Sequence, residues 1–307
     1  WGLAIGYKNT GLGGGAPDKA TAEVEAWHDA EKGPVAEVRI SSAEMGQGLP
    51  GVLASCAAEE LGIATENVNV LLGDTDVCPD GGPTTASRQT FVSGNAARHA
   101  ARDAAQLLAD APGKRVVARH EYWAPKTQPL GTGGDMHVAF SFAVQAALCE
   151  IDMRTGGVEV RRIIAAHDVG RAINPLTLEG QIEGGIVMCI GYALTEHYIQ
   201  EDGQPWTNVM ARYKTPSITH APSITSHIVE HEISTGPFGA KGMGELPSIP
   251  TSAAITNAIY NATGVRVRSL PVDQDALLHA IRSGADEVEL GWGDRVPIPD
   301  IEFGGPS

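Results

Sequence analysis

The chain has 307 residues, of which 42% are hydrophobic and 19% charged, enough apolar content for a packed core in one or two domains. The 22 lysines and arginines against 37 aspartates and glutamates give a net charge of −15. A surface this acidic repels phosphate backbones, so we do not expect nucleic-acid binding.

The cysteines and the apolar segments indicate in which cellular compartment the protein is expected. The four cysteines form no CxxC motif, which argues against an iron–sulfur or zinc-ribbon site, and a disulfide framework is not expected at this size. The longest apolar stretch, residues 184–194, is too short to span a bilayer, and the first residues lack the basic segment of a signal peptide. We therefore expect a cytoplasmic protein.

Hydrophobic periodicity predicts strands and helices that mix without regular alternation. The helix at 88–109 is alanine-rich, with Phe91, Ala97 and Leu107 as expected core positions. In chain order, the expected elements are strands at 21–27 and 35–41, a helix at 50–61, a strand at 67–72, a helix at 88–109, strands at 115–122, 137–152 and 158–166, a helix at 175–199, a strand at 224–233, and helices at 248–263 and 272–283.

This mixture predicts an α+β fold of mixed sheets with packed helices, in two lobes. The Pro/Gly-rich stretch 129–134 marks the seam between them. We expect a first lobe at 1–130, a second lobe at 131–283, and an extended C-terminal arm at 284–307, which is rich in Gly, Pro and acidic residues and has no period.

Three glycine-rich or Ser/Thr-rich turns lead directly into expected helices: residues 44–48, 81–87 and 239–245. Helix starts present N–H groups and partial positive charge, so three of them suit a large anionic ligand gripped at several points. Ordinary capping by Ser87 explains the second turn about as well. The turns together make a bound phosphorylated cofactor a hypothesis on a par with plain helix capping.

Glu245 is an acid among glycines just before an expected helix. Small neighbours let a bulky ligand approach, and a nearby helix start favours an ionised carboxylate that can accept a proton. The alternative is an exposed acid favoured by the helix dipole.

For two other motifs, the flanking residues do not predict the local structure that the motif's chemistry requires. Residues 227–231 match H-x-x-E-H, but their β-branched flanks predict a strand, whereas a zinc protease needs both histidines on one face of a helix. His167-Asp168 is either a catalytic pair or a turn at the end of a strand, and we favour the turn.

Six strings, in order, resemble the molybdenum-cofactor region of the xanthine dehydrogenase/aldehyde oxidase family, the molybdenum hydroxylases. The resemblance covers about residues 1–283 and is to the C-terminal half of that region, so the chain is similar to split-subunit members such as nicotinate dehydrogenase. The strings are Glu44-Met45-Gly46-Gln47-Gly48, Gly73-Asp74-Thr75, residues 84–90, Asp168-Val169-Gly170-Arg171 with Asn174-Pro175, residues 181–185, and residues 236–245.

The resemblance implies roles for particular residues. Glu245 matches the active-site glutamate, a general base that takes a proton as a water-derived oxygen attacks an electron-poor carbon. No residue of the protein binds the metal directly, because the pterin dithiolene holds the molybdenum. Tyr7 lies near an aromatic substrate contact of the family. The residues implied to bind the cofactor are Gly46, Gln47, Gly48, Thr85, Ala86, Ser87, Arg88, Gln89, Gln181, Lys241 and Gly242.

It also implies a catalytic subunit, or half of one, that binds molybdopterin, with the cytosine dinucleotide form left open. The expected substrate is an N-heteroaromatic such as a purine or nicotinate. The expected partners are a chain carrying the other half of the molybdopterin region, a [2Fe-2S] subunit and an FAD subunit. Aldehyde oxidoreductase, hydroxybenzoyl-CoA reductase or CO dehydrogenase-type activity, and a non-catalytic cofactor-binding protein, stay as alternatives. The cations Arg88, Arg98 and Lys241 are expected to offset the charge of the cofactor.

Overall fold

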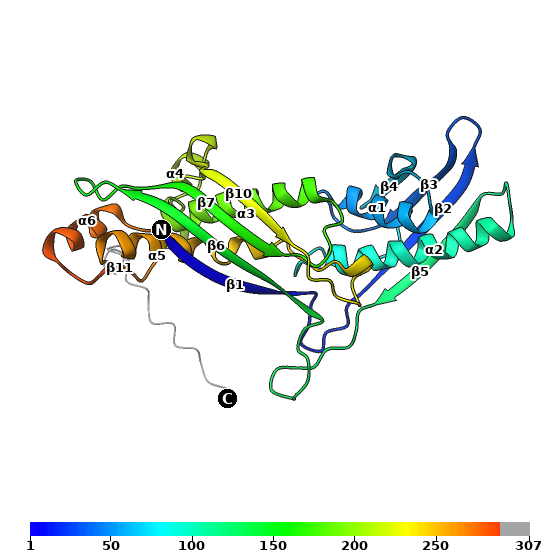
Figure 1. Ribbon diagram of the computed structural model, residues 1–307, viewed down its shortest axis with the longest axis horizontal. Helices are drawn as coiled ribbons and strands as arrows, with labels where there is room; N and C mark the ends of the chain where they lie inside the picture. Colours follow the sequence, from blue (N-terminus) through cyan, green and yellow to red (C-terminus); the bar gives the residue numbers. More distant parts are fainter. Residues whose placement is uncertain (289–307) are drawn as a thin grey trace.

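The computed structural model describes residues 1–288, which form two four-stranded sheets with helices packed on one face of each. The molecule is elongated, and the two sheets lie at opposite ends of its long axis (Figure 1). Helices and strands mix without regular alternation, so the expected α+β class is confirmed.

The first sheet has the strand order β4-β3-β2-β5, with β4 parallel to β3 and the other pairs antiparallel. Helices α1 and α2 pack together over one face of this sheet. These elements are β2 (Lys19–Asp29), β3 (Gly33–Ile40), α1 (Leu49–Leu61), η1 (Thr65–Asn67), β4 (Val68–Leu72), η2 (Gln89–Ser93), α2 (Gly94–Asp110) and β5 (Val116–Trp123).

Helix α2 lies close to the sheet because its inner face consists of alanines, including Ala97, Ala100 and Ala104, all fully buried. Phe91 is also buried, as predicted. The expectation for Leu107 was wrong: it is 42% exposed, and the next residue, Leu108, packs against the core in its place.

The second sheet has the order β1-β6-β7-β10, with β10 parallel to β7 and the other pairs antiparallel. Helices α3 and α5 pack against each other, and α5 covers β1 and β6. These elements are β1 (Gly2–Thr10), β6 (Ala139–Ile151), β7 (Val158–Asp168), α3 (Pro175–Leu194), β10 (Ser223–Val229), η4 (Pro237–Gly239), η5 (Leu246–Ser248) and α5 (Thr251–Thr263).

Strand β1 was not predicted, and it pairs with β6 along its whole length. The first ten residues therefore belong to the second sheet. A boundary at residue 130 assigns this strand to the first lobe, although it pairs with strands of the second sheet. The chain leaves the second sheet after β1, builds the first sheet, and returns at β6. Segments at opposite ends of the sequence meet where these crossings occur.

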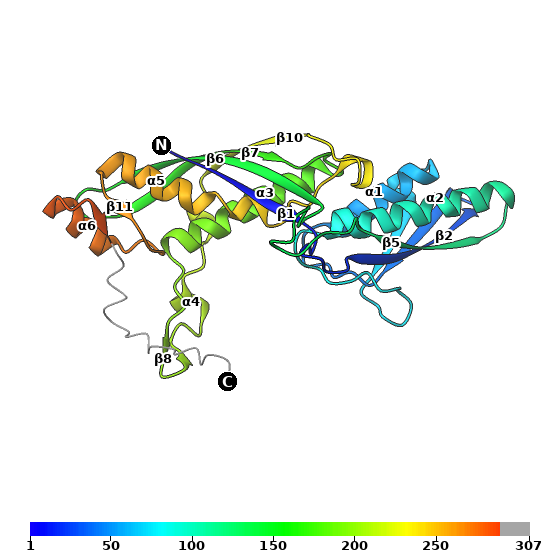
Figure 2. The same cartoon turned by 90° about the horizontal axis from the view of Figure 1, so that it is seen from below.

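Smaller elements were also missed. The hairpin β8 (Gln200–Glu201) and β9 (Gln204–Pro205), with the short α4 (Met210–Tyr213) and η3 (Ile218–His220), follows α3, and β8 and α4 project away from the second sheet (Figure 2). At the far end, β11 (Arg266–Val267) pairs with β12 (Glu287–Val288), next to α6 (Gln274–Ser283). The expected arm 284–307 thus begins with a paired strand, and residues 289–307 lie outside the described part.

Element ends differ from expectation for local reasons. Helix α3 begins as expected, where the Asn174 side chain accepts a hydrogen bond from the Thr177 N–H and Pro175 follows. It ends at Leu194 rather than at residue 199. Similarly, α5 starts at Thr251 instead of 248, since residues 246–248 form a separate 3₁₀ turn, and β10 stops at Val229, four residues before the expected end.

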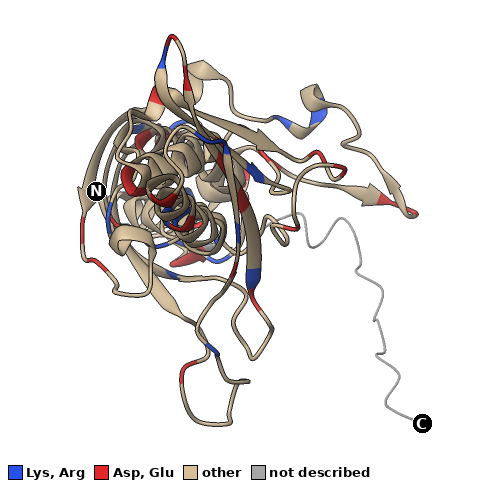
Figure 3. Cartoon of the chain, turned by 90° about the vertical axis from the view of Figure 1, so that its right-hand side faces the viewer, with Lys and Arg blue, Asp and Glu red and all other residues tan. Residues whose placement is uncertain are grey.

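Charged residues of both signs are interspersed along the chain (Figure 3). Among residues 1–288, no helix combines the length and apolarity needed to cross a membrane.

Candidate cofactor site

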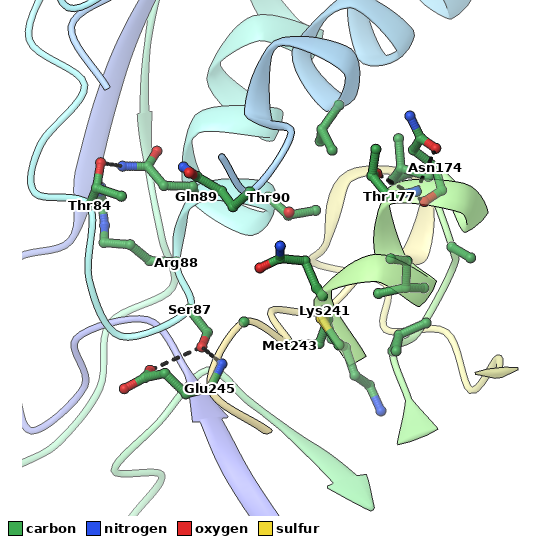
Figure 4. A pocket seen from close by; sticks show the side chains of 18 of the residues that line it. Thr84, Ser87, Arg88, Gln89, Thr90, Asn174, Thr177, Lys241, Met243 and Glu245 are labelled. Carbon is green, nitrogen blue, oxygen red and sulfur yellow. Dashed lines mark hydrogen bonds between the residues drawn. The ribbon is translucent and has the colours of Figure 1, made fainter. Parts of the chain in front are cut away.

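A cavity of about 390 Å³ lies where loops of the first sheet meet loops and a helix of the second. It is open to solvent, and its wall is mixed, with both apolar and polar side chains (Figure 4). Four segments that are distant in sequence supply this wall: residues 45–52, 84–90, 169–181 and 241–245. The three glycine-rich or Ser/Thr-rich turns singled out in the sequence therefore do meet at one cavity, with the start of α3 as a fourth contributor.

The loop at 84–90 turns sharply, because Ala86 and Ser87 both have φ +51°, in the left-handed region. Arg88 holds this loop from beneath and is completely buried. Its Nε donates to Asp18 Oδ1 at 2.7 Å, and its other nitrogens donate to the carbonyl oxygens of Gly81, Pro83 and Lys19 at 2.6–3.0 Å. The Arg88 charge is thus neutralised within the protein.

Gln89 is likewise occupied inside the protein. Its Nε2 donates to Thr84 Oγ1 at 2.7 Å, and its Oε1 accepts from Ser42 Oγ at 3.0 Å. The other two cations expected to face the cofactor are paired as well, Arg98 with Glu60 and Lys241 with Asp168, at 2.6 Å each. All three cations are thus paired with carboxylates of the chain, and their role in offsetting an anionic ligand stays a prediction.

The turn before α1 is organised by Glu44, whose carboxylate accepts from the N–H groups of Gly46, Gly48 and Leu49 at 2.7–3.0 Å. Gly46 and Gly48 have φ values of +97° and +81°, which only glycine adopts without strain. Gln47 lines the cavity, with its amide bonded to the Met45 N–H and the Ala43 carbonyl. Gly46 and Gly48 shape this wall and do not line it.

Gly242 sits where the two halves of the cavity come closest. A Cβ on it would lie 1.8 Å from the Ser87 carbonyl oxygen, so only glycine fits. Its N–H donates to Thr10 Oγ1 at 3.0 Å, and its carbonyl accepts from Ser141 Oγ at 2.8 Å, which fastens the 241–245 loop to β1 and β6.

Glu245 stands at the end of this loop, on the edge of the cavity, with its side chain about half exposed. Its Oε2 accepts from Ser87 Oγ at 3.0 Å, and its own N–H donates to that oxygen at 3.1 Å (Figure 4). Lys8 Nζ lies 3.1 Å from the same Oε2. A carboxylate held in this way on an open cavity can accept a proton from a bound molecule.

Helix α3 contributes Gln181, whose side-chain amide lines the cavity and makes no hydrogen bond to any residue of the described part. Sequence reasoning did not place Met45, Thr90, Asn174 or Met243 at the site, although they also line it. Their strings were part of the family resemblance, which was the available signal.

Tyr7 is not brought into the cavity. It is 65% exposed on the outer face of β1, where its ring contacts Phe140 and Phe142. The zinc-protease alternative fails as expected, because His227 is on β10 and His231 follows it, so the two do not share a helical face. His167 is fully buried at the end of β7, and Asp168 pairs with Lys241, so neither forms a catalytic pair with the other.

Comparison with known proteins agrees with this geometry. A family model described as a molybdopterin cofactor-binding domain matches residues 1–119 and 103–222. The gamma subunit of the 6-hydroxypseudooxynicotine dehydrogenase complex of Paenarthrobacter nicotinovorans is 33% identical over 279 residues, covering 78% of this chain and 35% of that protein.

Two solved structures extend the likeness to the fold. The aldehyde oxidoreductase of Desulfovibrio desulfuricans has a TM-score of 0.80 at 31% identity, over 91% of this chain and 32% of that one. Quinoline 2-oxidoreductase of Pseudomonas putida has a TM-score of 0.73 at 25% identity, over 92% and 42%. The chain belongs to the xanthine dehydrogenase/aldehyde oxidase family of molybdenum hydroxylases. It spans only about a third of the length of several of these relatives.

The residues present fit a molybdopterin. The free amide of Gln181 offers both donors and acceptors to a polar ring system, and apolar side chains such as Val52 and Met243 line the same cavity. The close approach of Gly242 to the Ser87 carbonyl holds the loops at 84–90 and 241–245 together beside the cavity, although Gly242 itself does not line it.

Proposed function

We propose that this chain is the part of a molybdenum hydroxylase that supplies the catalytic base, Glu245, and part of the cofactor cage, in an enzyme that oxidises an N-heteroaromatic. The observation that carries this proposal is the contact between Glu245 and Ser87, which joins two motif-bearing loops from different lobes at the edge of one cavity.

The cofactor would lie against the loop at 85–87, the Gln47 turn, the Gln181 amide and the loop at 241–242. Arg88 and Gln89 act by holding the first of these loops in place, since their side chains bond within the protein. Lys241 acts in the same way through Asp168. When bound, the molybdenum cofactor supplies the redox centre that takes two electrons while oxygen from water is added to the substrate.

Glu245 would accept the proton that is released from the oxygen nucleophile. Ser87 and Lys8 both contact Oε2, and among the described residues Oε1 has no hydrogen-bond partner. The carboxylate thus has one oxygen fixed by the protein and one available to a reacting group, the arrangement that general-base catalysis requires.

The test is Glu245→Gln, which keeps the size of the side chain and removes its basicity. We expect normal molybdenum and pterin content with turnover lower by about two to four orders of magnitude. Elemental analysis and pterin fluorescence measure the content, and steady-state assays of the reconstituted complex measure turnover. Full turnover in a cofactor-replete variant would refute the role of Glu245. A wild-type complex that holds cofactor without turnover would instead favour the non-catalytic alternative.

The substrate class rests on relatives. Quinoline, for which one solved relative is named, is an N-heteroaromatic, and a second relative is named for 6-hydroxypseudooxynicotine. Purine- and nicotinate-like rings are therefore the first compounds to assay. Aldehydes are the second class to assay. They are included because the aldehyde oxidoreductase is also similar to this chain, with a TM-score of 0.80 against 0.73 for quinoline 2-oxidoreductase.

Partner chains complete the proposed enzyme: one with the rest of the molybdopterin region, one with [2Fe-2S] clusters and one with FAD. The first of these finds support in the outer face of the second sheet, where Leu3, Ile5, Tyr7 and Phe142 are each more than half exposed. An apolar surface of this kind is typical of an interface. Mass spectrometry of co-purifying chains tests the partners, and analysis of the released cofactor distinguishes the cytosine dinucleotide from the simple pterin.

A further inference from the structure

Lys8 is a basic residue that neither the motifs nor the family resemblance singled out, and it contacts the proposed base. It lies on β1, where alternation places it on the face opposite to Tyr7. Its side chain is only 19% exposed, and its Nζ lies 3.1 Å from Glu245 Oε2. A lysine this enclosed loses much of its freedom to move, so its contact with Glu245 is well defined in space.

Other contacts fix the position of the Lys8 ammonium. It donates to Asn9 Oδ1 at 2.9 Å and to the Asn9 carbonyl at 3.3 Å, and Asn9 Nδ2 in turn donates to the Gly11 carbonyl at 2.9 Å. His137 is a further titratable group under its influence: burial first, and the positive charge of Lys8 second, lower the pKa of His137.

The contacts of Glu245 are one-sided. Lys8, on β1 of the second sheet, and the Ser87 hydroxyl, in a loop of the first sheet, meet at the same carboxylate oxygen, Oε2. Two fixed contacts on one oxygen determine the rotation of the carboxylate group as well as its position. A half-exposed glutamate without them would sample several rotamers.

We propose that Lys8 is a positioning residue, which holds the Glu245 carboxylate with Oε2 bonded to Lys8 and Ser87 and leaves Oε1 without a partner among the described residues. Its effect on turnover rests on the proposed function of Glu245, whereas its effect on the carboxylate does not. Misplacing a reacting group by about 1 Å costs up to about 100-fold in rate, so the hold on Glu245 is large enough to measure.

The first experiment measures the loaded complex. Lys8→Gln retains a donor for Asn9 and removes the charge, and we expect kcat to fall about tenfold or more with KM and cofactor content little changed. Lys8→Arg keeps the charge and should recover most of kcat. Lys19→Gln is the matched control, because Lys19 forms a comparable ion pair, with Glu121 at 2.7 Å, on the first sheet. A rise in KM alone, or a loss of molybdenum, would mean that Lys8 contacts substrate or cofactor and would overturn the proposal.

The second experiment does not need turnover. Carbon-13 NMR of the chain labelled at glutamate side-chain carboxyls detects Glu245, assigned as the resonance that is missing in Glu245→Gln. We expect that resonance to move in Lys8→Gln, to return toward its original position in Lys8→Arg, and to stay in place in Lys19→Gln. An unmoved resonance in Lys8→Gln overturns the proposal even if turnover falls.

The two experiments separate the two claims. If Glu245→Gln keeps full turnover, the proposed function fails, and the NMR result still decides whether Lys8 positions the carboxylate. If Glu245→Gln lowers turnover, and Lys8→Gln moves the resonance without changing kcat, catalysis does not depend on this contact, and the catalytic part of the proposal is rejected.

Discussion

At the scale of single residues, a buried polar side chain can either contact a ligand or form hydrogen bonds that hold a loop of the protein in place. Arg88 and Gln89 are predicted to contact the cofactor, and in the structure their side chains bond to Asp18, Thr84 and nearby carbonyl groups while both residues line the cavity. Residue type and spacing predict that a polar group will be needed at a turn. They do not tell whether the protein or a ligand satisfies it, since both offer the same hydrogen bonds.

His167 is a buried group with a consequence for stability. Burial lowers its pKa from the ordinary 6.5 to about 4, so the folded chain keeps it neutral where the unfolded chain takes up a proton. The stability it confers is complete above pH 6.5 and is lost as the pH falls toward about 4, by an amount of about 3 kcal/mol. Urea unfolding across this pH range measures the loss.

His167→Leu is the comparison for that measurement. The variant should show a shallower fall in the free energy of unfolding over the same pH range, because it has no proton to take up on unfolding. Equal slopes in the two proteins would mean that other groups, such as His99, whose pKa is also lowered by burial, account for the pH dependence.

At the scale of elements, most helices and strands could be predicted from periodicity, and β1 could not. Its inward-facing positions are the small residues Gly2, Ala4 and Gly6, of which Gly2 is buried and the other two are half-buried, while the large residues Leu3 and Ile5 face outward. Periodicity assumes that large apolar residues point to the core. Helix α5 leaves no room for a side chain at Gly2, and only glycine and alanine stand at the inward positions of β1. The large apolar residues therefore mark the outward face, and a pattern of large residues does not reveal the strand.

That close approach makes Gly2 sensitive to the smallest substitution. A Cβ at Gly2 would lie 2.1 Å from the Ala254 carbonyl oxygen and 2.2 Å from the Ala258 nitrogen, both backbone atoms of α5. We expect Gly2→Ala to lower the free energy of unfolding by about 1–3 kcal/mol, measured in urea. Gly184→Ala, on α3 with no atom within 4 Å of the new methyl, should instead be stabilising by about 0.5–1 kcal/mol. Similar values for both variants would contradict the packing argument.

At the scale of the whole molecule, the outer face of the second sheet exposes large apolar side chains, which a domain that is stable alone in water usually buries. β6 repeats the pattern of β1, with Ala143 and Ala147 buried and Phe142 56% exposed. The sequence indicated strands here, but not which face the helices would cover, because that depends on packing between distant segments.

The exposed face predicts the behaviour of the isolated chain. Phe142→Ser should reduce the fluorescence of a bound hydrophobic dye and leave the unfolding midpoint nearly unchanged, because the side chain lies outside the core. Leu130→Ser is the control, since Leu130 is 81% exposed in a loop away from this face. A dye signal that responds equally to both substitutions would argue against a continuous apolar surface.

The cavity has walls from both lobes, and this carries a consequence for the order of assembly. The loop at 84–90 hangs from the first sheet, and the loop at 241–245 is fastened to β1 and β6 of the second. A nascent or half-denatured chain in which only one sheet has formed offers a cofactor a single wall and little to grip. If the cofactor binds here as proposed, we expect it to be loaded only after both sheets have folded, so that cofactor occupancy would report on correct folding.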